Sequence, residues 1–379
     1  MSHLSHDFTY MARAMQLAKK GLYTTQPNPR VGCVIVNKNQ IVGEGYHHKA
    51  GEPHAEIFAL KQAGENAQGA TAYVSLEPCA HHGKTPPCAD ALINAGIKRV
   101  VCAMQDPNPL VAGQGLERLQ QAGIETSSGV LQAEAQALNP GFIKRMQTGL
   151  PYVRVKLAMS LDGRTAMASG ESKWITGEAA RHDVQKMRAR SSIVLTGSGT
   201  VIADNPSMNL RLDAAELGIE NGIEPFQPLR GVIDSQLVVE PDSQVFKSRG
   251  DTLIFTLAES IASSGNAKKF KAAQLVTIKP RSGKLDLLAL MQYLAEQQVN
   301  EVHVEAGSKL CGALLALQLV DEIVIYMAPN IMGDSAKGLF HLPQLQSMKQ
   351  RTDLSIKDVR AIGKDWRIIA VPEYSREKL

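Results

Sequence analysis

Short apolar runs alternate with helical segments along most of the chain, and this alternation is the feature that most limits its fold. In the first 150 residues, three predicted helices end in Ala-Gly, at Gly64, Gly96 and Gly123, and glycine is common just beyond a helix C-terminus. The runs VGCVIV and QIVGEGY flank a turn at residues 37–39 and predict a hairpin, and TAYVSL, RVVCAM and IETSSGV predict further strands. A hairpin followed by repeated strand–helix units predicts an α/β domain with a mixed sheet between helices.

A second alternating series begins after Gly149 and Pro151. It contains the predicted strands PYVRVKLAMSLDG, SIVLTG and EVHVEAG, the predicted helices EAARHDVQKMRARS and SKLCGALLALQLV, and a closing hairpin, DLSIKDVRAIGKDWRIIAVPEY. A chain of 379 residues is also too long for one core of ordinary size. We therefore expect two α/β domains, residues 1–148 and residues 149–379.

The composition disfavours several classes of protein. No apolar run approaches the ~18 residues that cross a bilayer, and the N-terminal segment predicts an amphipathic helix and not a signal peptide. Five cysteines, an odd number without export signals, favour a reducing compartment, so we expect a cytoplasmic protein without a membrane partner. A net charge of +4 with 5% aromatic residues suits small anions such as phosphates and argues against a nucleic-acid partner.

One imidazole and two thiols occur in a pattern that is typical of catalytic zinc. His54 begins the helix HAEIFALKQAG, Cys79 follows the strand TAYVSL, and Cys88 begins the helix CADALINAG. Catalytic zinc takes three protein ligands and leaves a fourth position for water. Zinc lowers the pKa of that water to about 7. Glu56 could then take its proton and deliver it to a ring nitrogen and a departing amine.

The order His-x-Glu followed by Pro-Cys is the signature of zinc deaminases that act on nucleobases, although this chain has eight residues between the cysteines and the signature has two. His81 or His82 in the intervening loop is an alternative ligand. A structural zinc module with four protein ligands, and a deaminase that acts on nucleic acid, are alternative functions. We interpret Cys33, Cys102 and Cys311 as small core residues.

Further polar residues near glycine or proline are candidates for contact with a polar heterocycle and its phosphate. Amide groups would bind the edges of the ring, and a lysine would meet the phosphate. An ordinary turn is the alternative interpretation for each of them. The candidates are Asn28, His47, Lys84, Thr85, Asp106 and Asn108.

The second half offers two glycine-containing turns for a dinucleotide. Gly197 and Gly199 follow a predicted strand, but Ile202 occupies the third glycine position of a Rossmann fingerprint. Gly307 and Ser308 begin a helix directly after the strand EVHVE, and the free N–H groups there could bind a pyrophosphate. An ordinary strand–helix turn is again the alternative.

A series of distinctive stretches follows the chain in the order NPRVGCVIV, GEGYH, GEPHAE, LEPCAHHGKTPPC, MQDPNP, KLAMSLDGRTA, ESKWIT and VEAGSKLCGALL. Through these stretches, and over nearly its whole length, the chain resembles the bifunctional deaminase/reductase family of riboflavin biosynthesis. The resemblance implies a cytidine-deaminase-like first domain that uses zinc to hydrolyse the 2-amino group of 2,5-diamino-6-(ribosylamino)-4(3H)-pyrimidinone 5′-phosphate. It also implies a dihydrofolate-reductase-like second domain that uses NADPH to reduce the ribosyl side chain, which gives 5-amino-6-(5-phosphoribitylamino)uracil.

The same resemblance implies site residues in the second domain. The implied NADPH contacts are Ala158, Trp174, Thr200, Asp204, Ser235 and the turn of Gly307, Ser308, Lys309, Leu310, Cys311, Gly312 and Ala313. The implied contacts with a small phosphorylated pyrimidine substrate are Ser172, Arg188, Met208, Arg211 and Glu305. Trp174 could pack beside the nicotinamide, Arg188 and Arg211 suit a phosphate, and a core position is the alternative for Met208.

Hydride transfer depends mainly on positioning, because the two reacting carbons must lie about 3–3.5 Å apart. Lys156 and Asp162 lie near the site in the sequence, but either could be structural, so the residues do not identify a proton donor. We also expect a homo-oligomer, either a dimer or a tetramer.

Overall fold

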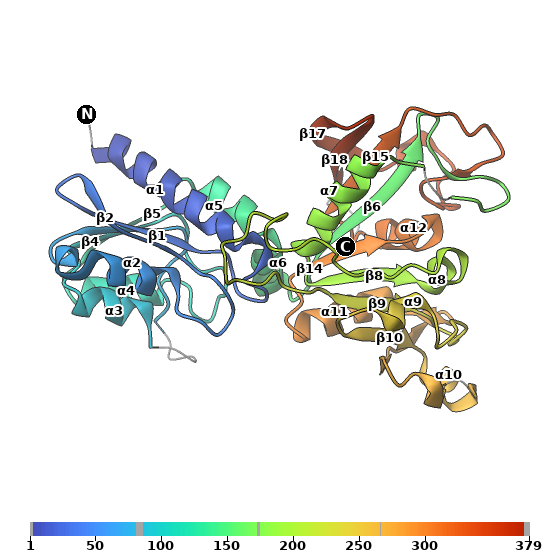
Figure 1. The fold of residues 1–379 in the computed structure, drawn as a ribbon, viewed down its shortest axis with the longest axis horizontal. Helices are drawn as coiled ribbons and strands as arrows, with labels where there is room; N and C mark the ends of the chain where they lie inside the picture. Colours follow the sequence, from blue (N-terminus) through green and yellow to red (C-terminus); the bar gives the residue numbers. More distant parts are fainter. Residues whose placement is uncertain (1–2, 81–85, 173–174, 266, 375–379) are drawn as a thin grey trace. The chain divides into compact units, whose positions relative to one another are not determined.

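The computed structural model describes residues 3–80, 86–172, 175–265 and 267–374 and divides into two compact units (Figure 1). Unit 1 contains Met1–Gly149 and Asp213–Phe226, and unit 2 contains Leu150–Leu212 and Gln227–Leu379. The segment of residues 213–226 lies within the stretch expected for the second domain, but its contacts group it with unit 1. None of the described helices is both long and apolar enough to span a bilayer.

Unit 1 has the predicted alternation of strands and helices around a mixed sheet. Its elements are α1 (His3–Lys20), β1 (Gly32–Asn37), β2 (Gln40–Tyr46), α2 (Ala55–Ala63), β3 (Thr71–Val74), α3 (Cys88–Asn94), β4 (Arg99–Cys102), α4 (Gln114–Gln121), β5 (Glu125–Ser128), α5 (Gln132–Leu138) and α6 (Pro140–Thr148), with short 3-10 turns at Gly21–Tyr23 and Gly64–Ala67. In the described part of the chain the strand order is β2-β1-β3-β4-β5. Strand β1 is antiparallel to β2 and β3, and β3, β4 and β5 are parallel.

The two faces of this sheet pack against different helices, because successive side chains of a strand point to opposite faces. Cys33 and Ile35 of β1 join the cluster formed by the alanines of α2 and by α3. Val34 and Val36 of the same strand join the cluster formed by α1. The sheet is therefore buried on both faces.

Two glycines of β2 allow α2 to pack directly on the sheet. A Cβ atom on Gly43 would lie 2.1 Å from the carbonyl oxygen of Ala59, and one on Gly45 would lie 2.3 Å from that of Ala55. Real Cβ atoms do not come so close to a backbone oxygen, so these positions require glycine. The close packing fixes the N-terminus of α2, where His54 is the N-cap.

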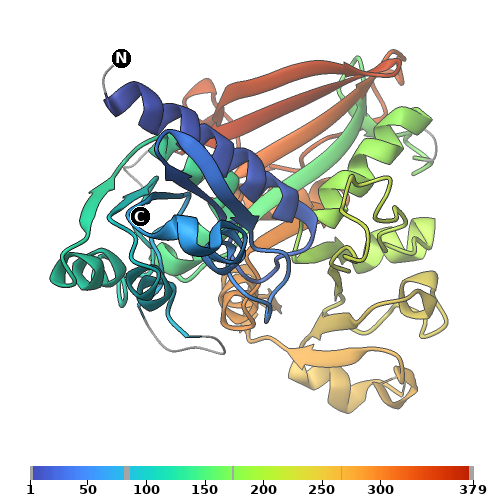
Figure 2. The same cartoon turned by 60° about the vertical axis from the view of Figure 1, so that its left-hand side comes forward.

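Unit 2 contains the second predicted α/β sheet. Its elements are β6 (Tyr152–Ser160), β7 (Arg164–Ala166), α7 (Glu178–Ala189), β8 (Ile193–Gly197), α8 (Ser198–Asp204), β9 (Leu229–Ile233), α9 (Gln244–Lys247), β10 (Thr252–Thr256), α10 (Ala258–Ser263), β11 (Gln274–Thr277), β12 (Pro280–Arg281), β13 (Lys284–Leu285), α11 (Leu287–Glu296), β14 (Glu301–Glu305), α12 (Ser308–Ala316), β15 (Glu322–Ala328), β16 (Lys337–Gly338), β17 (Asp353–Ile362) and β18 (Asp365–Glu373). The main sheet, within the described residues, has the order β11-β10-β9-β8-β14-β6-β15-β18-β17. The strands from β11 to β15 are parallel, and the predicted hairpin β17–β18 adds an antiparallel edge (Figure 2).

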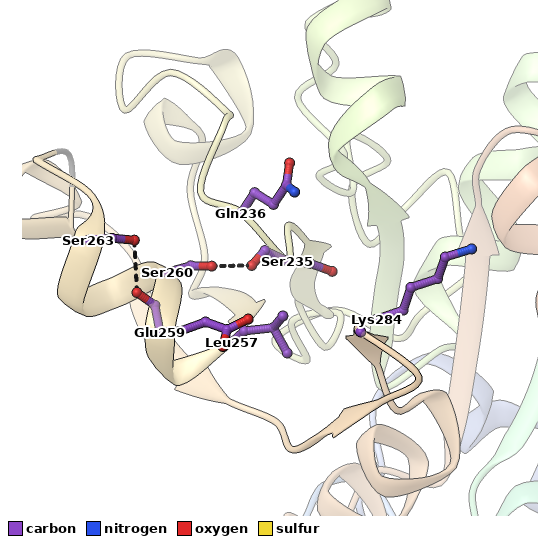
Figure 3. Close-up of a pocket in the computed structure, with 8 residues that line it drawn as sticks. Ser235, Gln236, Leu257, Glu259, Ser260, Ser263 and Lys284 are labelled. Carbon is purple, nitrogen blue, oxygen red and sulfur yellow. Dashed lines mark hydrogen bonds between the residues drawn. The ribbon is translucent and has the colours of Figure 1, made fainter.

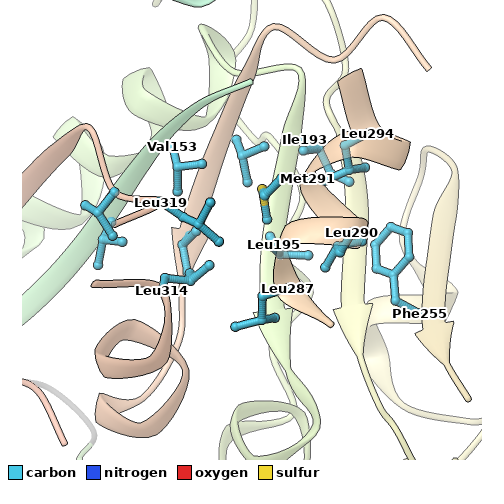
Figure 4. Close-up of a cluster of buried hydrophobic side chains, with 14 of the residues drawn as sticks. Val153, Ile193, Leu195, Phe255, Leu287, Leu290, Met291, Leu294, Leu314 and Leu319 are labelled. Carbon is cyan, nitrogen blue, oxygen red and sulfur yellow. The ribbon is translucent and has the colours of Figure 1, made fainter. Parts of the chain in front are cut away.

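The main core of unit 2 lies on one face of this sheet. Figure 4 shows Leu290 and Leu294 of α11 beside Ile193 and Leu195 of β8, and α12 packs into the same cluster. The other face of the central strands carries ionisable side chains. Strands β6 and β14 place Arg154, Glu301 and His303 there, all of them buried. Alternation along each strand explains the contrast, because the apolar residues between these ionisable ones face the core.

Candidate metal centre and strand-end cavity

Three side chains of unit 1 meet where their elements begin or end. His54 caps α2, Cys88 is the first residue of α3, and Cys79 lies in the loop after β3. The Nδ1 atom of His54 lies 3.2 Å from the Sγ atom of Cys88 and 3.6 Å from that of Cys79. A nitrogen and a sulfur ligand of one tetrahedral zinc ion lie about 3.6 Å apart. Among the described residues, these three form a group that could hold a metal ion.

The surroundings of Cys79 favour its thiolate form. The backbone N–H of Cys88 donates to the Sγ atom of Cys79 at 3.3 Å. A hydrogen bond from the thiol of Cys88, together with those from His54 and this N–H, outweighs burial and lowers the pKa of Cys79 to about 4. The pKa of Cys88 is raised, because its thiol keeps the shared proton. Zinc binds thiolates and deprotonates a coordinating thiol, so this donor set fits zinc.

Glu56 occupies the position that the sequence pattern assigns to a general base. Its side chain is buried, and burial raises its pKa to about 6. Among the described residues, its Oε2 atom is buried without a hydrogen-bond partner. An unpaired buried oxygen costs free energy, so the atom suits a site that receives water or a substrate.

Asn28 and His47, both predicted substrate contacts, lie close to these ligands. The rings of His47 and His54 meet edge to face, with centroids 5.4 Å apart. The Nδ1 atom of His47 donates to the carbonyl oxygen of Pro53 at 3.1 Å, so its Nε2 atom accepts from the amide of Asn28 at 3.0 Å. Burial lowers the pKa of His47 to about 4. The ring is therefore neutral at neutral pH, which fixes the orientation of Asn28.

Asp106 and Asn108, also predicted contacts, shape the loop after β4. The carboxylate of Asp106 accepts the backbone N–H of Asn108 at 2.8 Å. Glu77 is buried and connects this loop to the segment that carries Cys79, a role that no sequence motif indicated. Its position two residues before Cys79 is the sequence feature that could have indicated this role. Its carboxylate accepts the backbone N–H groups of Asp106, Gly113, Gly115 and Leu116.

Several predicted positions lie outside the described residues. They are Lys84, Thr85 and Trp174, together with the alternative ligands His81 and His82.

In unit 2, a cavity of about 1120 Å³ lies where the parallel strands end. Its walls come from the carboxyl ends of β6, β8, β9 and β14 and from the starts of α8 and α12. Ligands of open α/β sheets bind at this end of the strands. The predicted contacts that line this cavity are Ala158, Ser172, Arg188, Thr200, Asp204, Met208, Ser235, Glu305, Gly307, Ser308, Lys309 and Leu310.

The backbone at two helix starts is open in this cavity. A Cβ atom on Gly199 of α8 or on Gly307, the N-cap of α12, would meet no described atom within 4 Å. A dinucleotide could therefore approach the backbone closely at both places, and the cavity is large enough for one. The residues and the volume of this site fit a nicotinamide cofactor.

The later part of the predicted turn has a different environment. Cys311 is buried, and its thiol donates to the carbonyl oxygen of Ala306 at 3.3 Å. A Cβ atom on Gly312 would lie 2.3 Å from the carbonyl oxygen of His341. Neither residue is among the described residues that line the cavity, and neither is Ala313. The structure gives the first two a packing role, and cofactor contact by this part of the turn stays a prediction.

The arginine predicted to bind a substrate phosphate is paired with another predicted contact. Arg188 binds Glu305 through two hydrogen bonds of 2.6 and 2.9 Å, and it also donates to the carbonyl oxygen of Asn209. Burial alone would raise the pKa of Glu305. The charge of Arg188, the nearby ring of His303 and the hydrogen bonds from Arg188 instead hold this pKa well below its usual value. Arg211, the other predicted phosphate ligand, is exposed and does not line the described cavity.

The cavity also contains polar residues to which the resemblance gave no ligand. Lys156, which lies near the site in the sequence, lines the cavity from the middle of β6, and burial lowers the pKa of this lysine. A smaller pocket of about 410 Å³ shares Ser235, Gln236 and Lys284 with the cavity (Figure 3). In it, Ser260 donates to the carbonyl oxygen of Ser235 at 2.7 Å. Ser235 and Gln236 follow the carboxyl end of β9, a position that can be assigned to the cavity only when the order of the strands is known.

Comparison with known proteins identifies both units. Residues 4–104 match the family described as "Cytidine and deoxycytidylate deaminase zinc-binding region", and residues 151–368 match "RibD C-terminal domain". The riboflavin biosynthesis protein RibD of Escherichia coli is 52% identical over 362 residues, which cover 95% of this chain and 97% of that protein. The RibD protein of Haemophilus influenzae is 49% identical over 97% of this chain and 98% of its own length.

Solved structures agree with these relatives. A structure of Acinetobacter baumannii RibD has a TM-score of 0.89 at 46% identity, and the match covers 98% of this chain and 100% of that chain. A diaminohydroxyphosphoribosylaminopyrimidine deaminase/5-amino-6-(5-phosphoribosylamino)uracil reductase from Thermotoga maritima has a TM-score of 0.85 at 33% identity, with the same coverage. This chain therefore belongs to the RibD family and is a bifunctional enzyme of riboflavin biosynthesis, in which a zinc-dependent deaminase and an NADPH-dependent reductase share one polypeptide.

Proposed function

We propose that residues 1–148 deaminate 2,5-diamino-6-(ribosylamino)-4(3H)-pyrimidinone 5′-phosphate and that residues 149–379 reduce the ribosyl side chain of the product. The observation that carries the first step is the placement of the buried carboxylate of Glu56 beside His54, Cys79 and Cys88. The observation that carries the second is the strand-end cavity with open backbone at two helix starts. The Thermotoga maritima relative is named for the same two activities.

In the deaminase, His54, Cys79 and Cys88 would hold the zinc ion. When bound, zinc supplies a Lewis acid that makes water acidic near neutral pH. Glu56 would take a proton from this water, because its raised pKa is close to the working pH of a general base. The same carboxyl group would give this proton to the ring nitrogen. It would then take the proton of the hydroxyl group now on the ring carbon and give it to the amine, which leaves as ammonia while the carbonyl forms. Asn28, held by neutral His47, would bind the edge of the pyrimidine.

In the reductase, the chain mainly binds and orients two ligands. When bound, NADPH supplies the hydride that reduces C1′ of the ribosyl side chain. The backbone around Gly199 and Gly307 would hold the dinucleotide along the ends of β8 and β14. The pair of Arg188 and Glu305 would hold a fixed hydrogen-bonding surface toward the substrate, because each side chain keeps the other in place. Positioning of this kind brings the reacting carbons together.

We also propose a cytoplasmic homo-oligomer. The thiols of all five cysteines are free, as a reducing compartment requires. Edge strand β17 exposes Ile356 and Val359, and Trp366 of the adjacent strand β18 is also exposed. A long edge strand with exposed apolar side chains is a surface that proteins commonly cover with another chain. Sedimentation of the purified protein measures the number of subunits, and a monomer at micromolar concentration would contradict this part.

The proposed function is tested with the variant Glu56→Gln. Wild-type and variant proteins are incubated with zinc, the diaminopyrimidinone phosphate and NADPH, while ammonia release and NADPH absorbance are followed together. We expect the variant to keep its zinc and to release ammonia about 10²- to 10⁴-fold more slowly, because an amide cannot relay the proton. Supplied with deaminated substrate, the variant should oxidise NADPH at the wild-type rate.

The matched control is Glu65→Gln, which removes an exposed carboxylate just after α2. Its ammonia release should equal that of the wild-type protein. Turnover in Glu56→Gln at the wild-type rate would remove Glu56 from the mechanism. Failure of the wild-type protein to release ammonia from this substrate would reject the proposed reaction itself.

A further inference from the structure

One segment of the chain belongs to the reductase half in sequence and to the deaminase unit in structure. Residues 213–226 fall inside the stretch that matches the RibD C-terminal domain, yet they pack with unit 1. The segment holds its own shape, because Asp213 and Glu216 each bind the backbone N–H of the other, at 2.9 and 3.0 Å. Its Leu217 and Ile219 side chains are buried. It is therefore an ordered part of unit 1.

The segment binds α1 and the turn that follows this helix. The carboxylate of Glu220 forms an ion pair with Lys20 at 2.9 Å. The backbone N–H of Phe226 donates to the carbonyl oxygen of Tyr23 at 2.7 Å. Ile223 packs against the apolar cluster that α1 forms with β1 and β2. The contacts include an ion pair, a backbone hydrogen bond and apolar burial.

The same segment reaches the end of β2, directly before His47. Tyr46, the last residue of β2, belongs to the cluster that Ile223 covers. Burial and then the carboxylate of Glu220 raise the pKa of the Tyr46 hydroxyl. Glu220 and His48 also line one surface pocket of about 520 Å³. Both chain neighbours of His47 are thus in the region that the segment contacts.

His47 depends on its backbone for its position in the site. Its ring is held between Pro53 and Asn28 and lies edge to face against the ring of His54. The rings of Tyr46 and His48 are in contact, with centroids 4.3 Å apart and planes tilted by 49°, so the residues on both sides of His47 pack together. A shift of this strand end would therefore carry His47 away from Asn28, and a displacement of about 1 Å at a reacting site can cost about 10²-fold in rate.

We propose that residues 213–226 hold the end of β2 and thereby position His47 and Asn28 for the deaminase substrate. Deamination then depends on a segment that lies within the reductase part of the sequence. The inference rests on the proposed function of unit 1. Glu220 and Ile223 are positioning residues, because they act through Tyr46 and His47.

The test uses three variants of the full-length chain: Ile223→Asn, Ile223→Leu and Glu224→Gln. The first removes the apolar contact, the second keeps it, and the third changes an exposed side chain of the same segment. We expect Ile223→Asn to raise the deaminase KM at least about tenfold. The absorption spectrum of the cobalt-substituted protein should stay unchanged, because the three ligands do not move. The reductase rate on deaminated substrate should also stay unchanged, and Ile223→Leu and Glu224→Gln should match the wild-type protein.

Amide hydrogen exchange at residues 46–48 gives a readout that needs no activity. It should be faster in Ile223→Asn than in the wild-type protein and should return to the wild-type rate in Ile223→Leu. Unchanged KM and unchanged exchange in Ile223→Asn would overturn the proposal, and so would equal loss of both activities. If the wild-type protein releases no ammonia, the proposed function fails, whereas the exchange measurement still decides whether the segment holds the strand end.

Discussion

The metal centre and the strand-end cavity represent two ways of building a site. The first concentrates its chemistry in His54, Glu56, Cys79 and Cys88, which lie within 35 residues of one another. The ligand atoms of the histidine and the two cysteines lie within 4.8 Å of one another. The second spreads its chemistry over strands β6, β8, β9 and β14, which lie between residues 152 and 305 of the 379-residue chain. A site of the first kind depends on the identity of single atoms, whereas a site of the second kind depends on the packing of the whole sheet. Single substitutions in the two units can therefore test this contrast.

The variant Cys88→Ser should have the largest effect, and it should be confined to unit 1. Loss of a hydrogen-bonding partner outside the ligand set already lowers metal affinity about 10- to 100-fold, so loss of a thiolate ligand should lower zinc affinity more than 100-fold. Zinc per chain after dialysis should fall to background, and ammonia release should fall with it. Metal analysis and the ammonia assay measure both.

The variant Cys88→Ser also tests whether the reductase activity of unit 2 is independent of the metal centre. NADPH oxidation on deaminated substrate should persist at the wild-type rate, because Cys88 belongs to unit 1 and the strand-end cavity to unit 2. Cys102→Ser is the matched control, since Cys102 is a buried thiol outside the metal group. A parallel loss of reduction in Cys88→Ser alone would mean that the two activities are not separable.

The contrast also explains what the sequence could predict. The metal group was predictable because a strand end and a helix start fix the positions of Cys79 and Cys88, and because the donor atoms themselves name the chemistry. Burial of Glu56 follows from its place in the first turn of α2. The role of Glu77 was not predicted, because its hydrogen-bond partners are backbone N–H groups of a distant loop. Backbone groups leave no side-chain pattern in the sequence.

The variant Arg188→Ala should destabilise unit 2 by about 3–5 kcal/mol, the usual cost of removing one partner from a buried ion pair. Both side chains of the pair are nearly buried, with 9% and 13% of their surfaces exposed. Both tryptophans lie in unit 2, so their fluorescence during denaturation reports this unit. The double variant Arg188→Met with Glu305→Gln should recover part of the loss, because it leaves no unpaired charge.

Kinetics of the Arg188 variants separates structure from binding. If Arg188 contacts substrate, the stable double variant should still show a raised KM for the substrate and an ordinary KM for NADPH. Equal changes in the two KM values would contradict the assignment of Arg188 to the substrate side. Ammonia release should be unaffected in every one of these variants, because unit 1 is unchanged.

The reductase contacts were only partly predictable, for a physical reason. Residues at strand ends can be assigned to one cavity only when the order of the strands is known. Sequence patterns predict the strands but do not predict which strands are neighbours. The family resemblance implied that Thr200 and Ser235 contact NADPH, and both residues line the cavity. The resemblance could not show that Glu305 would bind Arg188, or that Gly312 would face the backbone of another segment.

The variant Gly312→Ala tests this last point with a moderate effect. Helix propensity alone favours alanine over glycine by about 1 kcal/mol. The new methyl group would, however, lie 2.3 Å from the carbonyl oxygen of His341, and overpacking of this kind costs about 1–3 kcal/mol. We expect a net loss of up to about 2 kcal/mol in the free energy of unfolding of unit 2, with an unchanged KM for NADPH. Greater stability with a raised KM would favour cofactor contact instead.

We expect the smallest effect in the pH dependence of the stability of unit 2. His303 is buried in the centre of the sheet, with its Nε2 atom 3.4 Å from an oxygen of Glu305. Burial lowers its pKa from 6.5, and the charges of Arg154 and Arg188 act in the same direction, while Glu305 opposes them. The folded protein therefore keeps this imidazole neutral at pH values where the unfolded chain protonates it.

The sign of the pH dependence follows from this difference in proton binding. Below pH 6.5 the unfolded chain binds more protons at this position than the folded chain does, so protonation favours unfolding. The stability that His303 preserves is therefore fully present above pH 6.5 and is lost progressively as the pH falls below it. The variant His303→Gln is neutral at every pH and should show a flatter decline, measured by tryptophan fluorescence during denaturation at several pH values. A decline as steep as that of the wild-type protein would mean that the proton is taken up elsewhere in unit 2, and the pH dependence would then belong to the charged network and not to this imidazole.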